Sequence, residues 1–330
     1  MILFAALASL VLAAMPLILS AYPLFIFSHM LVLAIACLAL NLLYGTAGSL
    51  SLGHATYFGV AAYAGGFLHR FLSVESLELY LIVGILCSIV FAGVIGFLCV
   101  RTSKIFFTIL TLALSMVIYS LVINGAVFRL FGGLGWALYL LGGGGLFLPR
   151  LTILGSTFAP AQFMVALYYV IVAAFITSMF LLWRISASPF GQALRAIRDN
   201  ETRAAFIGIP VRLYRWRAFV LSGLFMGIAG GLYGQLARQI TPEQLHWLFS
   251  AKLVLATVLG GTRHFLGPVL GAFGFVALDE VASRWSVGRY AVFGILLIVV
   301  VLAVPRGIAG ALVDLAAAAR RRRRRSTATQ

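Results

Sequence analysis

The chain has 330 residues, of which 63% are hydrophobic and only 10% are charged. Soluble globular domains carry about 25% charged residues, so this composition excludes a surface that faces water and indicates a protein embedded in lipid. The net charge of +16 is unevenly spread, because six arginines form the run Arg320–Arg325. Beside a membrane such a run favours anionic lipid, so we expect membrane lipid and no nucleic acid as a partner.

Ten apolar runs follow one another along the chain, most of them near the length of about 20 residues that spans a bilayer. They lie at about 2–20, 23–44, 50–68, 79–100, 105–123, 161–183, 214–236, 246–261, 267–283 and 289–304. The first has no basic region ahead of it and no clear cleavage site, so we interpret it as a span and not as a removed leader. The third, eighth and ninth are short or rich in glycine, which predicts broken or re-entrant helices. The predicted fold class is all-α: a polytopic integral membrane protein with about 8–10 transmembrane helices.

Basic residues predict the orientation. Seven arginines fall within 184–217, and Arg306 and the terminal arginine run follow the last span. Because arginine and lysine concentrate in cytoplasmic loops, both regions are predicted to be cytoplasmic, and counting spans back places the N-terminus there too. The predicted domains are a transmembrane domain over 1–312, with a cytoplasmic loop at 184–213, and a basic cytoplasmic tail over 313–330.

The cytoplasmic loop is predicted to form two short helices. Ser188 suits an N-cap and Pro189 suits the first helical position. Asp199 and Asn200 interrupt that helix, and either can cap a second one, for which Gly208 supplies the C-terminal stop. The residues alone also allow a plain amphipathic loop lying on the membrane surface.

Four stretches, read together, resemble a known family. They are Asn41–Gly59 (NLLYGTAGSLSLGHATYFG), Gly191–Glu201 (GQALRAIRDNE), Gly260–Ala272 (GG, then LGPVLGA) and Pro305–Gly310 (PRGIAG). They are similar to the permease subunits of ATP-binding-cassette (ABC) importers, most of all to the LivM-like permeases of branched-chain amino acid importers. The matches run in the family's order from about residue 33 to 312. The chain departs from the family's pattern at Arg263 and His264, where the family usually has glycine and threonine.

The resemblance implies a transport subunit, not an enzyme, that carries branched-chain or related amino acids across the cell inner membrane. Its implied partners are a second homologous permease subunit, two ATP-binding-cassette ATPase subunits docking at 188–209, and a periplasmic substrate-binding protein. ATP and Mg²⁺ would sit on the ATPases, and no cofactor is expected in this chain. The residues agree, because the sequence has no G-x-x-x-x-G-K-[ST] loop and its only lysines are Lys104 and Lys252. Similar permeases carry other amino acids, amides or urea, so the cargo stays open.

The loop supplies the residues expected to couple this chain to the ATPases. They are Gly191, Arg195, Ala196, Arg198, Asn200, Glu201, Ala204 and Gly208. The small residues favour close approach by another protein. The side chains of Arg195 and Arg198 are expected to pair with acidic groups on the ATPase; alternatively, they hold the loop at the lipid headgroups.

Two interrupted stretches supply the residues expected to line the translocation pathway. They are Gly45, Gly48, Ser49, Ser51, Gly53, His54, Tyr57, Gly260, Gly261, Gly267 and Pro268. Glycines let helix backbones approach closely, and paired interrupted segments often mark the pathway in transporters. His54 is either a functional intramembrane group or a helix-packing histidine with a satisfied hydrogen bond.

Other function classes fit less well. An ion-coupled secondary transporter would need carboxylates in mid-span, and an intramembrane enzyme would need a polar cluster around His54; neither pattern is apparent. A structural or signalling protein is disfavoured by the broken, glycine-rich spans. The three cysteines, Cys37, Cys87 and Cys99, lie inside apolar runs, which predicts neither a disulfide nor a metal site.

Overall fold

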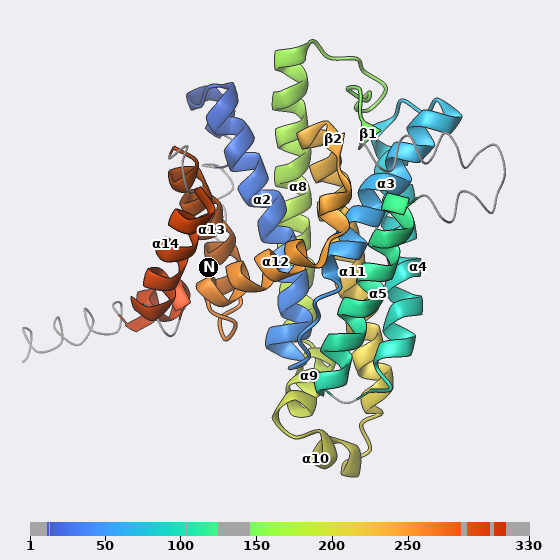
Figure 1. The fold of residues 1–330 in the computed structure, drawn as a ribbon, viewed down its shortest axis with the longest axis vertical. Helices are drawn as coiled ribbons and strands as arrows, with labels where there is room; N and C mark the ends of the chain where they lie inside the picture. The colour runs from blue at the N-terminus through green and yellow to red at the C-terminus, as the bar shows by residue number, and fades with distance from the viewer. Residues whose placement is uncertain are drawn as a thin grey trace, which may run out of the picture.

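The computed structural model describes residue 12 and residues 14–102, 104–124, 146–284, 289–303 and 307–314. Within them the chain is a bundle of helices with a small two-stranded ribbon near one end (Figure 1). The long helices are α2 (Ala21–Asn41), α3 (His54–Leu72), α4 (Leu77–Cys99), α5 (Lys104–Asn124), α8 (Pro160–Ala187) and α11 (Val211–Ala237). The shorter elements are the π-helix η1 (Leu42–Thr46), α9 (Pro189–Asp199), α10 (Glu201–Phe206), the 3₁₀-helix η2 (Pro242–Leu245), α12 (Trp247–Gly260), α13 (Gly267–Ser283), α14 (Arg289–Ala303) and the strands β1 (Leu146–Phe147) and β2 (Gln239–Ile240).

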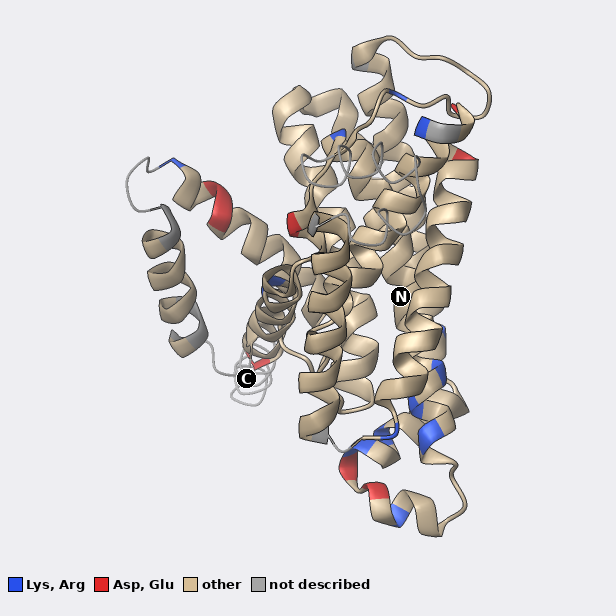
Figure 2. Cartoon of the chain, turned by 45° about the vertical axis from the view of Figure 1, so that its right-hand side comes forward, with Lys and Arg blue, Asp and Glu red and all other residues tan. Residues whose placement is uncertain are grey.

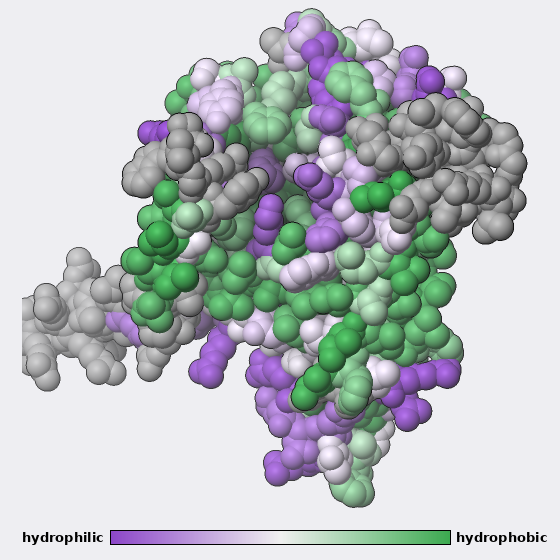
Figure 3. Space-filling view, viewed as in Figure 1, coloured by the Kyte–Doolittle hydropathy of each residue, from purple (hydrophilic) through white to green (hydrophobic). Residues whose placement is uncertain are grey.

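Five of the described helices are long and apolar enough to cross a membrane. They span Ala21–Thr46, Leu77–Cys99, Ile105–Ile123, Gln162–Ala187 and Val211–Ala237. Hydrophobic side chains cover the middle of the molecule, and hydrophilic ones gather over α9 and α10 at its lower end (Figure 3). These features confirm the predicted all-α polytopic class. Of the predicted first span, 2–20, residues 2–11 and 13 lie outside the described residues, and 14–18 are helical.

Of the three runs predicted to be broken or re-entrant, the third is interrupted, and the eighth and ninth each form one short, continuous helix. The third becomes helical only at His54, after an irregular stretch from Gly48 to Gly53. The eighth and ninth form α12 and α13, of 14 and 17 residues. At 1.5 Å per residue α12 is about 21 Å long, which is shorter than the roughly 30 Å hydrocarbon core of a bilayer. Alone, α12 cannot cross it.

Helix α2 is the centre of the bundle. Every residue from Leu31 to Leu43 is buried, and α2 packs against α8, α11, α12 and α13. The helix carries no Asp, Glu, Lys or Arg and has no polar face, the pattern of a helix enclosed on all sides. Its C-terminal end, continued by η1, lies toward the end of the bundle that carries α9 and α10 (Figure 1).

The end away from α9 and α10 carries a ribbon that the sequence analysis did not predict. Strands β1 and β2 pair antiparallel, with Leu146 opposite Ile240 and Phe147 opposite Gln239. The backbone N–H of Leu148 extends the ribbon by donating to the carbonyl oxygen of Arg238 at 2.9 Å. This pairing joins the segment before α8 to the segment after α11.

Candidate functional site

The 184–213 loop forms the two predicted helices, α9 and α10, which project from the end of the bundle (Figure 1). The Ser188 hydroxyl accepts from the backbone N–H of Gly191 at 3.4 Å, and the Asn200 side chain accepts from that of Arg203 at 2.9 Å. Gly208, just past α10, has a φ of +87°, a left-handed conformation that favours glycine. The predicted caps and stop are therefore confirmed, with Asn200 as the cap of the second helix.

Loop and bundle pack through the apolar face of α9. The side chains of Leu194 and Ile197 are fully buried. Gly191 lies so close to the carbonyl oxygen of Ser186 that an added Cβ would collide with it, and Ala204 is buried within the chain as well. The small size of Gly191 and Ala204 therefore serves packing inside this chain, while Ala196 is only half-buried.

Both predicted arginines of α9 contact helix ends of the same chain. Arg195 donates from Nη1 to the carbonyl oxygen of Ser186, near the end of α8, at 2.9 Å. Arg198 donates from Nη1 to the carbonyl oxygen of Gly45, in η1, at 2.5 Å, and its Nε lies 3.3 Å from a carboxylate oxygen of Asp199. Both guanidinium groups thus hold the loop against the bundle. The expected pairing of Arg195 and Arg198 with acidic groups on an ATPase stays a prediction.

A partly buried ion pair fixes α10 to α11, with the Arg215 side chain buried and the Glu201 side chain 45% exposed. Arg215 donates to both carboxylate oxygens of Glu201, from Nη1 at 2.8 Å and from Nη2 at 2.6 Å. The Arg215 side chain is only 5% exposed. Such two-pronged pairs are among the strongest charge-assisted contacts and fix geometry as well as position. Within this chain, Glu201 thus anchors α10.

The first predicted pathway stretch is packed inside the bundle. Ser49, Ser51 and Gly53 are buried. Gly53 approaches α5 closely, since an added Cβ would lie 2.7 Å from the carbonyl oxygen of Thr111. Non-helical backbone at membrane depth requires such enclosure by protein or a watery cavity, and here the helices provide the enclosure.

His54 is fully buried and joins three helices. The Ser222 hydroxyl donates to the carbonyl oxygen of Ala39 at 2.6 Å, and His54 Nε2 lies 2.8 Å from the same hydroxyl oxygen. Because the hydroxyl proton is already used, His54 Nε2 must be the donor to Ser222. The imidazole also makes edge-to-face contacts with the rings of Tyr57 and Phe219. These contacts favour the helix-packing interpretation of His54, and they enclose Tyr57 as well.

The second predicted stretch brings helix backbones together. An added Cβ on Gly260 would collide with the carbonyl oxygen of Gly267, and one on Gly271 with that of Ala256. Gly261, with a φ of +97°, begins the turn. Pro268 lies in the first turn of α13, where the missing N–H leaves no helical bond unmade.

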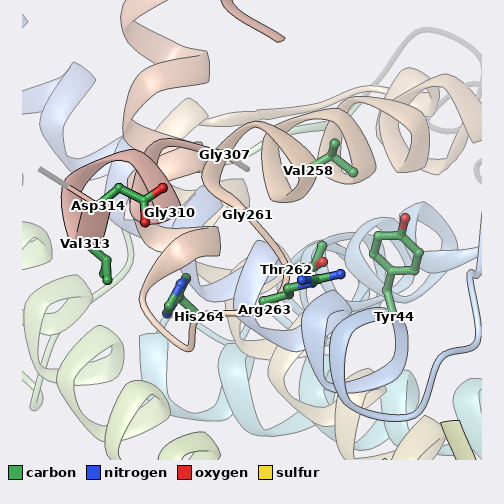
Figure 4. A pocket seen from close by; sticks show the side chains of 10 residues that line it. All are labelled: Tyr44, Val258, Gly261, Thr262, Arg263, His264, Gly307, Gly310, Val313 and Asp314. Carbon is green, nitrogen blue, oxygen red and sulfur yellow. The ribbon is translucent and has the colours of Figure 1, made fainter. Parts of the chain in front are cut away.

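The two stretches meet at a cavity. An added Cβ on Gly45 would lie 2.8 Å from the carbonyl oxygen of Thr262, which places η1 against the α12–α13 turn. The cavity there, of about 530 Å³, is lined by Tyr44 of η1, by the turn residues 261–264 and by residues of the 307–314 segment, including Asp314; of the predicted pathway residues, Gly261 lines it. Figure 4 shows Arg263 on the side of Tyr44 and His264 on the side of Asp314. Arg263 and His264, the two departures from the family pattern, both lie exposed in the turn between α12 and α13.

Sequence reasoning missed the apolar tip of the loop. Phe206 is 86% exposed and Ile207 70% exposed, on the segment that projects beyond the charged residues of the loop (Figure 2). Large apolar side chains exposed together on a polar surface mark interaction sites. The sequence contained a signal for this tip, because two large apolar residues directly precede the helix stop at Gly208 on an otherwise polar loop.

The chain is similar in sequence to a known family and to several known permeases. The family described as the permease component of branched-chain amino acid transport systems matches residues 22–302. Over 323 residues the chain is 24% identical to the high-affinity branched-chain amino acid transport system permease protein LivM of Escherichia coli (strain K12), which covers 91% of this chain and 73% of that protein. No solved structure matches.

Shorter stretches resemble permeases whose names give other cargo. The chain is 35% identical over 107 residues to the autoinducer 2 import system permease protein LsrC of Klebsiella pneumoniae, 30% of each chain. It is 34% identical over 114 residues to the guanosine ABC transporter permease protein NupQ of Bacillus subtilis, 33% of this chain and 34% of that one. The family match, by contrast, runs from α2 to almost the end of α14. The chain therefore belongs to the family of permease components of branched-chain amino acid transport systems.

Proposed function

We propose that this chain is the membrane-spanning permease subunit of an ATP-driven ABC importer, and that it carries branched-chain amino acids across the inner membrane. The observation that carries the proposal is the 184–213 loop. Both of its helices are capped at their starts, and the contacts of Arg198 and Glu201 fix it to the bundle. The exposed side chain of Phe206 lies at its tip. A rigid projection with an apolar tip is suited to contact with a soluble partner.

The energy would come from two ATPase subunits docking on the loop from the cytoplasm, and ATP and Mg²⁺ would be bound there. A second, homologous permease would complete the pathway, and a periplasmic binding protein would deliver the cargo to the opposite end. The loop's charges support a cytoplasmic location for this end and for both termini, since arginines concentrate on that side.

Branched-chain amino acids are the proposed cargo because the similarity to LivM covers 91% of this chain, whereas the similarities to LsrC and NupQ cover about a third of it or less. The alternatives are urea, amides or other small polar solutes. An ion-coupled mechanism has less support, because Glu78, in the first turn of α4, is the one carboxylate within the five long spans.

Uptake into proteoliposomes tests the proposal. The chain is reconstituted with the permease, ATPase and binding-protein chains encoded in neighbouring genes, and uptake of labelled leucine is measured with and without internal ATP. We expect ATP-dependent uptake that unlabelled isoleucine and valine inhibit and guanosine and urea do not. ATP-dependent uptake inhibited by guanosine or urea instead would contradict the cargo, and uptake driven by an ion gradient without ATP would contradict the class.

A further inference from the structure

We propose that Arg198 is the positioning residue that carries movement of the loop into the broken 42–53 segment at the end of the central span. The inference rests on the proposed function, because it concerns how docking on the loop reaches the pathway. It assigns the Arg198 guanidinium to a contact inside this chain in place of the ATPase contact expected from the sequence.

The guanidinium caps the end of a span. The last carbonyl groups of a helix have no partner within it, and basic side chains bind them and interact favourably with the negative end of the helix dipole. Helix α2 and η1 form one span that ends at Thr46, and Arg198 donates to the carbonyl oxygen of Gly45 in its last turn. The two residues are 153 positions apart in the chain.

The stem of the same side chain packs on the backbone just beyond. Gly48 has a φ of +69°, and a Cβ added there would collide with Cγ of Arg198. Glycine is therefore required twice at this position, for its conformation and for the room it leaves. Arg198 thus holds the segment at two points, the carbonyl group of Gly45 and the backbone of Gly48.

What Arg198 holds is a junction of several helices. The π-helix η1 is the C-terminal continuation of α2, and α3 begins at His54, only eight residues after Thr46. Gly45 also lies against Thr262 in the α12–α13 turn. Short π-helical stretches occur frequently at functional sites, and this one meets both stretches of predicted pathway residues. A shift of Arg198 therefore displaces the end of α2, the start of α3 and the turn together.

The hydrogen bonds of the two other arginines reach only neighbours of the loop in sequence. Arg195 binds the carbonyl group of Ser186, nine residues away, and Arg215 binds Glu201, 14 residues away. Both contacts join the loop to helices that are already attached to it covalently. Of the three arginines, Arg198 is the one that ties the loop to a distant span.

The test is the amount of leucine transported per ATP hydrolysed in the reconstituted complex. Arg198→Gln removes the tie, and Arg217→Gln is the matched control: it removes an equal charge from an exposed position at the start of α11, outside 188–209. We expect Arg198→Gln to lower transport per ATP by between about twofold and thirtyfold, the range for residues that carry coupling between sites. The ATPases should stay bound, and Arg217→Gln should keep the wild-type ratio.

Three results would overturn the inference: a wild-type ratio in Arg198→Gln, an equal fall in Arg217→Gln, or loss of the ATPases from the Arg198→Gln complex, which would make Arg198 a docking residue. Gly48→Ala and Arg198→Lys keep the test decisive where Arg198→Gln does not fold. Both should lower the ratio, and unchanged coupling in both contradicts the tie.

The wild-type complex separates the two proposals. If it shows no ATP-driven uptake, the proposed function fails first, and hydrogen exchange in the purified chain then tests the tie alone. Faster exchange across 42–53 in Arg198→Gln than in Arg217→Gln supports the tie, and equal exchange overturns it.

Discussion

At the scale of single residues, the contact between His54 and Ser222 shows how one polar group can hold three helices. His54 begins α3, Ser222 lies in α11, and Ala39 supplies the carbonyl group from α2. Because Ser222 gives its proton to Ala39, the chain of hydrogen bonds requires a proton on Nε2 of His54. This bond gives the buried Nε2 of His54 the partner that water would otherwise supply.

We expect His54→Leu to lower the free energy of unfolding by about 1–3 kcal/mol, because Ser222 loses its donor in a buried site. His54→Gln should lose less, since its amide N–H can donate from nearly the same place. The measurement is thermal unfolding of the purified chain in detergent, followed by uptake at equal amounts of folded protein.

Ser222→Ala supplies the matched partner for a double-mutant cycle. The loss from both changes together should be smaller than the sum of the single losses, because the two residues share one interaction. A fully stable His54→Leu protein that has lost uptake would point instead to a role of His54 in the pathway.

At the scale of elements, the pairing of α12 with α13 depends on backbones that touch. Gly260 and Gly271 face each other across the pair, and Gly271 lies against the carbonyl group of Ala256. A carbonyl group held in a helix cannot rotate away as a side chain can. Helix α12, too short to cross a bilayer alone, is therefore held to α13 by contacts that admit no side chain.

Gly271→Ala should destabilise the chain by about 1–3 kcal/mol, the usual cost of adding a methyl group where no room exists. Gly294→Ala is the control, because nothing lies within 4 Å of an added Cβ at that position in α14. There alanine should be neutral or stabilise by up to about 1 kcal/mol, through its higher helix propensity. Thermal unfolding of both proteins gives the comparison, and equal melting temperatures would show that the α12–α13 contact can relax.

Elements set by local chemistry could be predicted from the sequence. Ser188, Pro189 and Gly208 define the ends of the loop helices by neighbour effects alone, and the structure has those ends. The π-helix η1 could not be predicted, because its widened turn depends on surroundings such as Asn41 and the α12–α13 turn. The β1–β2 ribbon was missed for a similar reason, since two-residue strands gain their pairing only when α8 and α11 are in place.

The contact partners of the charged side chains in the loop could not be predicted from the sequence either. Arg198 and Glu201 both lie on a polar loop, and sequence alone directs such groups outward to a partner or to lipid. In the structure their partners are the carbonyl group of Gly45 and the guanidinium group of Arg215. Contacts of this kind depend on the packing of distant segments, which periodicity and spacing do not encode.

At the scale of the whole molecule, exposed apolar residues occur at both ends of the bundle as well as along its middle. Phe206 forms the tip of the loop, and Leu154, 85% exposed, lies beyond the ribbon end. The middle is covered by lipid in a membrane, whereas these two positions lie on segments outside the long spans. Each is suited to contact a different partner.

Phe206→Asp should therefore weaken binding of the ATPase subunits by about 2 kcal/mol or more, or roughly thirtyfold, as expected for a buried aromatic anchor. Co-purification of the ATPases with the permease in detergent measures the effect. Leu154→Asp, a similar change at the opposite end, should retain them. ATPase binding that survives Phe206→Asp would place the docking surface elsewhere on the loop.

The tie between Arg198 and Gly45 also bears on the order in which the chain is made. Synthesis completes α2 and η1 long before α9 emerges, and 153 positions separate the two partners. Long-range contacts form late because the intervening chain must first be closed. The C-terminal end of the central helix therefore lacks its contact with Arg198 while α3 to α8 are inserted. The nascent permease acquires its final shape only once its loop has been synthesised.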